Sequence, residues 1–189
     1  MNIQRKTAGK AEGPKIENLH VALVADLKAD ARCAAATPSA VFTGDADGPL
    51  RAYSASDGQG QLFVERERDK AVNCVCVVNG SNLWVGGASG DLAVFTLATG
   101  EKKVKPFLAH DKGVWTIVNV RGKFVVTGGA DFQVKVWSLA CESLHASGQH
   151  SGAVKCILSF PASTDGSQLP AVWSGAQVRT APHPSGTTG

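Results

Sequence analysis

The sequence has no long apolar run, which removes the usual signs of a membrane or secreted protein. None of its hydrophobic stretches approaches the roughly 18 residues that a membrane-spanning helix requires. Residues 1–15 also lack the apolar segment of a secretory signal peptide. The five cysteines are an odd number, so a framework of paired disulfides is not expected. These absences favour a cytoplasmic protein without a membrane span, with a nuclear location as the alternative.

The common motifs of catalysis and of cofactor binding are missing as well. There is no Gly-x-x-x-x-Gly-Lys-Ser/Thr loop, no Gly-x-Gly-x-x-Gly after a strand and no His-Glu-x-x-His pair. Ser89 lacks the Gly-x-Ser-x-Gly spacing of a nucleophile elbow. A second set lacks the tight Cys-x-x-Cys clamp of structural zinc sites, namely Cys141, His145, His150 and Cys156. We therefore expect no enzyme active site, no metal and no cofactor.

Charge is sparse and its excess lies at one end of the chain. The net charge is +3, and residues 1–16 hold four basic side chains against Glu12 alone, so the remainder is balanced. Four spaced charges are a weak signal for a nucleic-acid surface, so nucleic acid is not an expected partner. We predict that residues 1–16 and 181–189 are disordered tails and that residues 17–180 form the folded part.

What the sequence does contain is a repeated hairpin. The stretch VVTGGADFQVKVWSL (125–139) runs from an apolar strand through a Gly-containing turn and returns to Trp137. VFTGDADGPLRAYSA and WVGGASGDLAVFTLA follow the same course, and the last aromatic residues, Tyr53, Phe95 and Trp137, fall 42 positions apart each time. A damaged fourth copy, AVWSGAQV, follows a polar insert.

Each hairpin is preceded by a further strand that begins with a valine, at Val72, Val114 and Val154. Asn-Gly and Arg-Gly pairs supply tight turns to the next strand. A more polar edge strand follows each hairpin, so a period holds four antiparallel strands. Such a period is typical of a propeller blade and predicts an all-β fold. The predicted strands are 72–78, 82–87, 91–97 and 103–107 in blade two, and 114–119, 123–128, 133–138 and 142–146 in blade three.

These residues resemble the WD-repeat β-propeller family over roughly residues 30–175. Blade three matches best, with His110, Thr127, Asp131 and Trp137 in the family's positions, although Ser138 replaces the final aspartate. The resemblance implies that these four side chains form a structural tetrad: a hydrogen-bonded chain that pins strands and is not a hydrolytic triad.

The other blades keep less of this pattern. Blade one keeps Thr43 and Asp47 but has tyrosine for tryptophan, and blade two has no polar chain. Blade four keeps His150 and Ser174, has Val178 in place of the aspartate, and lacks its third strand.

The chain is too short for a complete ring of the family's usual kind. Propellers have about 4–8 blades, and the resemblance implies seven of about 42 residues, whereas this sequence supplies three blades and part of a fourth. We therefore expect an incomplete WD-repeat propeller. It is either a fragment or truncated form, or a chain whose ring is completed by another chain.

The resemblance implies a non-catalytic protein–protein interaction scaffold. The alternative is the regulatory WD-repeat portion of a larger enzyme such as an inositol-polyphosphate 5-phosphatase. We call the strand that precedes each hairpin the innermost strand of its blade. The position after its first valine holds Asn73, Trp115 and Lys155 in blades two, three and four. The residue type thus changes from blade to blade, as expected for a surface that binds a partner. Tryptophan is enriched among binding hot spots, so Trp115 is the leading candidate, with packing between blades as its alternative role.

Overall fold

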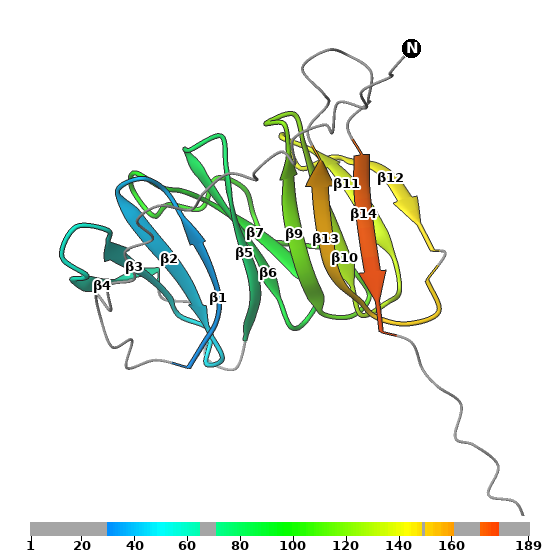
Figure 1. Cartoon of the computed structure of the whole chain (residues 1–189), viewed down its shortest axis with the longest axis horizontal. Coiled ribbons are helices and arrows are strands. Elements are labelled where there is room, and N and C mark those ends of the chain that lie inside the picture. Colours follow the sequence, from blue (N-terminus) through cyan, green and yellow to red (C-terminus); the bar gives the residue numbers. More distant parts are fainter. Residues whose placement is uncertain (1–29, 65–70, 149, 161–170, 178–189) are drawn as a thin grey trace, which may run out of the picture.

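The computed structural model describes residues 30–64, 71–148, 150–160 and 171–177, and every regular element among them is a β-strand. The strands form separate antiparallel sheets that lie side by side in chain order, from β1 to β14 (Figure 1). In each sheet, strands that follow one another in the sequence are also neighbours in space. The predicted all-β fold with four-stranded antiparallel blades is confirmed. Both predicted tails lie outside the described residues.

Over residues 30–177, outside the gaps named above, three blades have four strands and the last has two. Blade one holds β1 (Ala31–Ala36), β2 (Ala40–Asp45), β3 (Leu50–Ser54) and β4 (Gly60–Val64). Blade two holds β5 (Val72–Val78), β6 (Asn82–Gly87), β7 (Asp91–Thr96) and β8 (Phe107–Leu108). Blade three holds β9 (Val114–Val120), β10 (Phe124–Gly129), β11 (Val134–Ser138) and β12 (Ser143–Ser147), and blade four holds β13 (Val154–Phe160) and β14 (Ala171–Ala176).

One predicted strand was placed wrongly. The edge strand of blade two was expected at 103–107, but β8 begins only at Phe107 and is two residues long. Lys102 forms an isolated bridge with Phe95 before the chain leaves the sheet. Pro106 has no N–H to give to a ladder, which explains why regular pairing does not run through this segment.

Successive blades are joined by a repeated contact between a glycine and a valine. The first residue of β5, β9 and β13 is a valine that is fully buried against a glycine of the preceding blade. The pairs are Gly44–Val72, Gly86–Val114 and Gly128–Val154. A Cβ added at Gly44 would lie 2.2 Å from Val72, and one at Gly128 would lie 2.5 Å from Val154. Only glycine therefore fits beside the valine of the next blade.

The core lies between the blades. Phe42, Leu83 and Phe95 belong to the cluster between blades one and two, and Trp84 and Trp137 belong to the cluster between blades two and three. A smaller aliphatic cluster joins blades three and four. Each large side chain buried in this way contributes about 1.5–3 kcal/mol relative to exposure. Stability therefore depends on every blade having a neighbour.

Each innermost strand also carries a β-bulge one residue after its start. The pairing skips one residue between Ala31 and Cys33, and the same irregularity recurs at the start of β5, β9 and β13. The skipped residues are Arg32, Asn73, Trp115 and Lys155, and we call them the bulge row. A bulge turns its extra residue away from the regular ladder, and bulges are over-represented next to functional sites.

Candidate functional site

The bulge row connects neighbouring blades through its side chains. Arg32 Nη1 donates to Asn73 Oδ1 at 3.4 Å, which links blades one and two. Lys155 Nζ lies 3.2 Å from the centroid of the Trp115 ring, which links blades three and four. An ammonium above an indole is a favourable cation–π arrangement. Four consecutive blades thus present polar, aromatic and cationic groups at equivalent positions.

A hollow of about 230 Å³ lies beside Trp115, between blades three and four. Its lining side chains and backbone come from Lys112, Trp115, Ala130, Phe132, Gly152, Ala153, Lys155 and Gln177. The only charged residues in this lining are the two lysines, so the hollow is locally cationic. Lys112 Nζ lies 5.8 Å from the centroid of the Phe132 ring, so each ammonium is close to an aromatic face.

Phe132 holds a backbone conformation that suits glycine. Its φ is +71°, whereas the equivalent turn residues of blades one and two are Gly48 (φ +104°) and Gly90 (φ +93°). A bulky side chain in this region of φ is an outlier that costs of the order of 1–3 kcal/mol. Blade three therefore keeps an aromatic side chain beside the hollow at the expense of local backbone strain.

The three residues predicted to bind a partner lie in different environments. Asn73 is buried and accepts from Arg32, Trp115 is half-buried, and Lys155 is exposed above the Trp115 ring. Trp115 Nε1 is itself buried and has no hydrogen-bond partner among the described residues. Sequence reasoning missed Arg32, because β1 begins with Ala31 and not with a valine. The offset of 41 positions from Arg32 to Asn73 was the available signal.

His110, Thr127, Asp131 and Trp137 form one hydrogen-bonded chain in blade three. Trp137 Nε1 donates to Thr127 Oγ1 at 2.9 Å, and Thr127 Oγ1 lies 2.8 Å from His110 Nε2. His110 Nδ1 lies 2.9 Å from Asp131 Oδ1. The Asp131 carboxylate also accepts from the backbone N–H groups of Asp111 and Gln133. Every member of the chain is therefore satisfied.

A neutral His110 ring is consistent with the hydrogen bonds of this four-residue chain. Burial lowers the pKa of His110, and the hydrogen bond and charge of Asp131 only partly oppose that effect. A neutral ring with its proton on Nδ1 donates to Asp131 and leaves Nε2 to accept from the Thr127 hydroxyl. His110 and Thr127 have no exposed surface, so no substrate can reach the hydroxyl. The arrangement can hold strands together but offers no nucleophile.

Blades one and four differ in how much of this hydrogen-bonded chain they keep. In blade one, Asp47 matches Asp131 in sequence but is exposed, and Asp45 instead pairs with Arg51 at 3.0 Å. Thr43 Oγ1 is buried without a partner among the described residues. The polar chain suggested by Thr43 and Asp47 is therefore absent from this part of the structure. Blade four retains one contact, of 2.8 Å, between His150 Nε2 and Ser174 Oγ.

The described residues hold neither a grouped set of metal ligands nor a membrane-spanning helix. In that part of the chain, no three His, Cys, Asp or Glu side chains are grouped so that they could hold a metal ion. No helix there is long and apolar enough to cross a membrane.

Comparison with solved structures decides the fold. The structure "RRP9 WD40 repeats" superposes with a TM-score of 0.63 at 20% identity, covering 71% of this chain and 43% of that chain. The chain has the fold of a partial WD40 propeller. U3-55K gives a TM-score of 0.63 at 20% identity, covering 71% of this chain and 44% of that one. The designed protein Ika4 gives 0.62 at 20% identity, covering 77% of this chain and 91% of the designed chain.

The chain spans less than half the length of these two natural WD40 structures. No protein-family model and no curated protein sequence matches it. Identity of 20% supports the shared fold alone.

Proposed function

We propose that this chain is a non-catalytic protein–protein interaction scaffold whose partner docks across the bulge row. The single observation that carries the proposal is the bulge itself. It recurs at the same place in four consecutive blades, yet each blade fills it with a different side chain. A position that served only to pack the blades would keep one chemistry. Side chains that differ from blade to blade suit an asymmetric partner.

The hollow beside Trp115 provides the anchoring point of the proposed surface. Its two aromatic residues, Trp115 and Phe132, can contact an apolar side chain, and Lys112 and Lys155 can pair with a carboxylate of the same partner. Charge complementarity of this kind accelerates association and fixes orientation. We therefore propose that the docking segment is acidic, with an apolar residue next to the acidic one.

The test compares two alanine substitutions of aromatic residues in the sheet of blade three, one at the proposed site and one away from it. Trp115→Ala removes the proposed anchor, whereas Phe124→Ala removes a 43% exposed aromatic at the opposite end of β10. Partners cross-linked to the full chain are identified, and the affinity of each is then measured by calorimetry. Trp115→Ala is expected to weaken binding by more than about 1 kcal/mol with little change in melting temperature, and Phe124→Ala to leave affinity unchanged. Equal affinities for the two variants would contradict the proposed site.

We also propose a second kind of partner, namely a chain that completes the propeller. We propose that the protein is cytoplasmic, and imaging of the tagged full chain tests this location.

The alternative function is a regulatory WD-repeat portion of a larger enzyme such as an inositol-polyphosphate 5-phosphatase. This chain covers only 43% and 44% of the two WD40 structures, and this observation supports the alternative of a portion of a larger protein. A coding sequence that continues past Gly189 into a catalytic domain would support it.

A further inference from the structure

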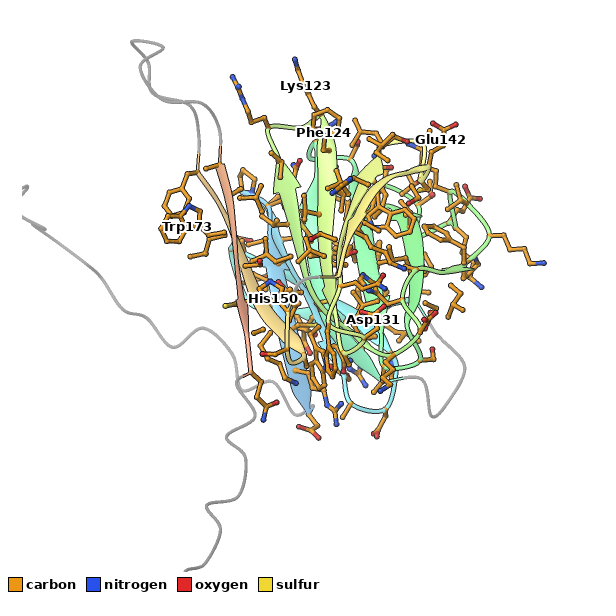
Figure 2. All side chains as sticks on the ribbon, turned by 90° about the vertical axis from the view of Figure 1, so that its right-hand side faces the viewer. Lys123, Phe124, Asp131, Glu142, His150 and Trp173 are labelled. Atoms are coloured by element: carbon orange, nitrogen blue, oxygen red, sulfur yellow. The ribbon has the colours of Figure 1, made fainter. Side chains whose placement is uncertain are left out.

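The free face of blade four carries side chains of the type that elsewhere lie between blades. Leu158 of β13 pairs with Trp173 of β14, in the register in which Cys76 pairs with Trp84 in blade two. Trp84 is 1% exposed, in the cluster that blade two shares with blade three, whereas Trp173 is 70% exposed. Figure 2 shows the Trp173 side chain pointing away from β14 into open space. Among the described residues, no neighbouring blade covers this interblade face of blade four.

The same face contains an unfilled glycine position. Gly175 pairs with Cys156 as Gly86 pairs with Cys74. At Gly86, Val114 of the next blade occupies the space that a side chain would need. At Gly175, the Cys156 sulfur, at 2.7 Å, is the only described atom within 4 Å of an added Cβ. Within the described part of the chain, Gly175 therefore has no counterpart of the valine that lies against the equivalent glycine in the other contacts.

The opposite end of the described chain supplies the complementary half. Val72, Val114 and Val154 begin the innermost strands of blades two to four, and each is 0% exposed. The equivalent residue of blade one is Ala31, which is exposed at the start of β1. One end therefore has an empty glycine position, and the other has an uncovered first residue, an alanine, at the place where the other blades have the valine that fills such a position.

We infer that a second copy of this chain docks head to tail, with Ala31 of blade one against Gly175 of blade four in the other copy. The contact joins two different surfaces, so two such contacts between two copies can close a ring. Two copies contribute eight blades, six with four strands and two with two described strands, which is within the range of about 4–8 blades seen in propellers. The pairing would cover Leu158 and Trp173 in both copies.

The cysteines give the expected geometry of this contact. The thiols of Cys33 and Cys74 donate to the carbonyls of Val72 and Val114, the first residues of the following blades, at 3.9 and 3.7 Å. Cys156 is at the equivalent place in β13 and is exposed. In the inferred dimer its sulfur would face the backbone of Ala31 in the other copy.

Sedimentation velocity on the full chain tests the association. We expect a dimer at tens of micromolar for the wild-type chain and a monomer for Leu158→Lys at the same concentration. Leu144→Lys is the matched control, because Leu144 is 50% exposed but lies on β12, outside the proposed contact, and should remain dimeric. A monomeric wild-type chain, or the same stoichiometry for both lysine variants, would overturn the inference. Melting curves establish that each variant is folded.

Site-directed cross-linking tests the head-to-tail orientation independently. Ala31→Cys, treated with a short bismaleimide, should give a covalent dimer through native Cys156, and adding Cys156→Ser should abolish it. Ala36→Cys places a thiol at the far, exposed end of the same strand and should give no more dimer than the wild-type chain. A dimer that depends on Leu158 but cross-links equally from both positions would refute the proposed orientation.

Discussion

Trp137 donates its indole N–H to the hydroxyl of Thr127 across 2.9 Å, joining β11 to β10 within blade three. The same hydroxyl lies 2.8 Å from His110 Nε2, so a side chain from the loop before β9 is tied to both strands. Because all these groups are buried, loss of one member leaves a polar atom unpaired in the interior.

The first prediction concerns Asp131, the last residue of this hydrogen-bonded chain. Asp131→Ala should lower the free energy of unfolding by about 1–3 kcal/mol, because His110 Nδ1 loses its acceptor in a buried place. Asp47→Ala is the matched control, since Asp47 has the same place in blade one but is exposed, and should change stability little. Urea denaturation measures both. Equal effects of the two substitutions would show that the hydrogen-bonded chain of blade three makes no specific contribution to stability.

The second prediction concerns pH. Burial lowers the pKa of His110 in the folded chain, so below about pH 6.5 the unfolded state binds the proton more readily. The stability from a neutral His110 should therefore be complete above about pH 6.5 and decrease as the pH falls below it. Denaturation curves between pH 5 and 8 measure this slope. His110→Gln should flatten it, whereas His145→Gln, at an exposed position, should not.

The third prediction concerns the thiols. Burial raises the pKa of Cys33 to about 11 and also raises the pKa values of Cys74, Cys76 and Cys141. Thiolates react and thiols do not, so these four should label slowly. Cys156 is exposed and should be the first cysteine modified in folded Leu158→Lys protein, where no second copy covers it. Peptide mapping after brief iodoacetamide treatment identifies the site. Early modification of Cys74 would contradict the described packing.

The fourth prediction concerns the glycines between blades. Gly128→Ala should destabilise the chain by about 1–3 kcal/mol, because the new methyl group would overlap Val154 of the next blade. Gly148→Ala is the control, since the nearest atom to its added Cβ lies 3.9 Å away. Thermal melting of the two variants gives the comparison. Unchanged melting of Gly128→Ala would mean that the blades separate freely at this contact.

The sequence pattern predicted most strands because apolar alternation and turn residues are local signals. It did not assign β1, whose first residues, Ala31 and Arg32, lack the valine that marks the other innermost strands. The bulges were also invisible, because a bulge is defined by the strand that pairs with it. The position of Lys155 above Trp115 depends on two blades that are adjacent in space but 40 positions apart in the chain.

The glycine and valine of each blade contact have a consequence for how the chain can be altered. Blades two and three each present a glycine to the next blade and a valine to the preceding one, so the contacts on their two sides are of one kind. Deletion or duplication of one whole period between equivalent valines, such as Val72 and Val114, would join surfaces that already match. A cut within a period would leave one glycine and one valine without partners. The chain should therefore tolerate changes in length only in whole repeats.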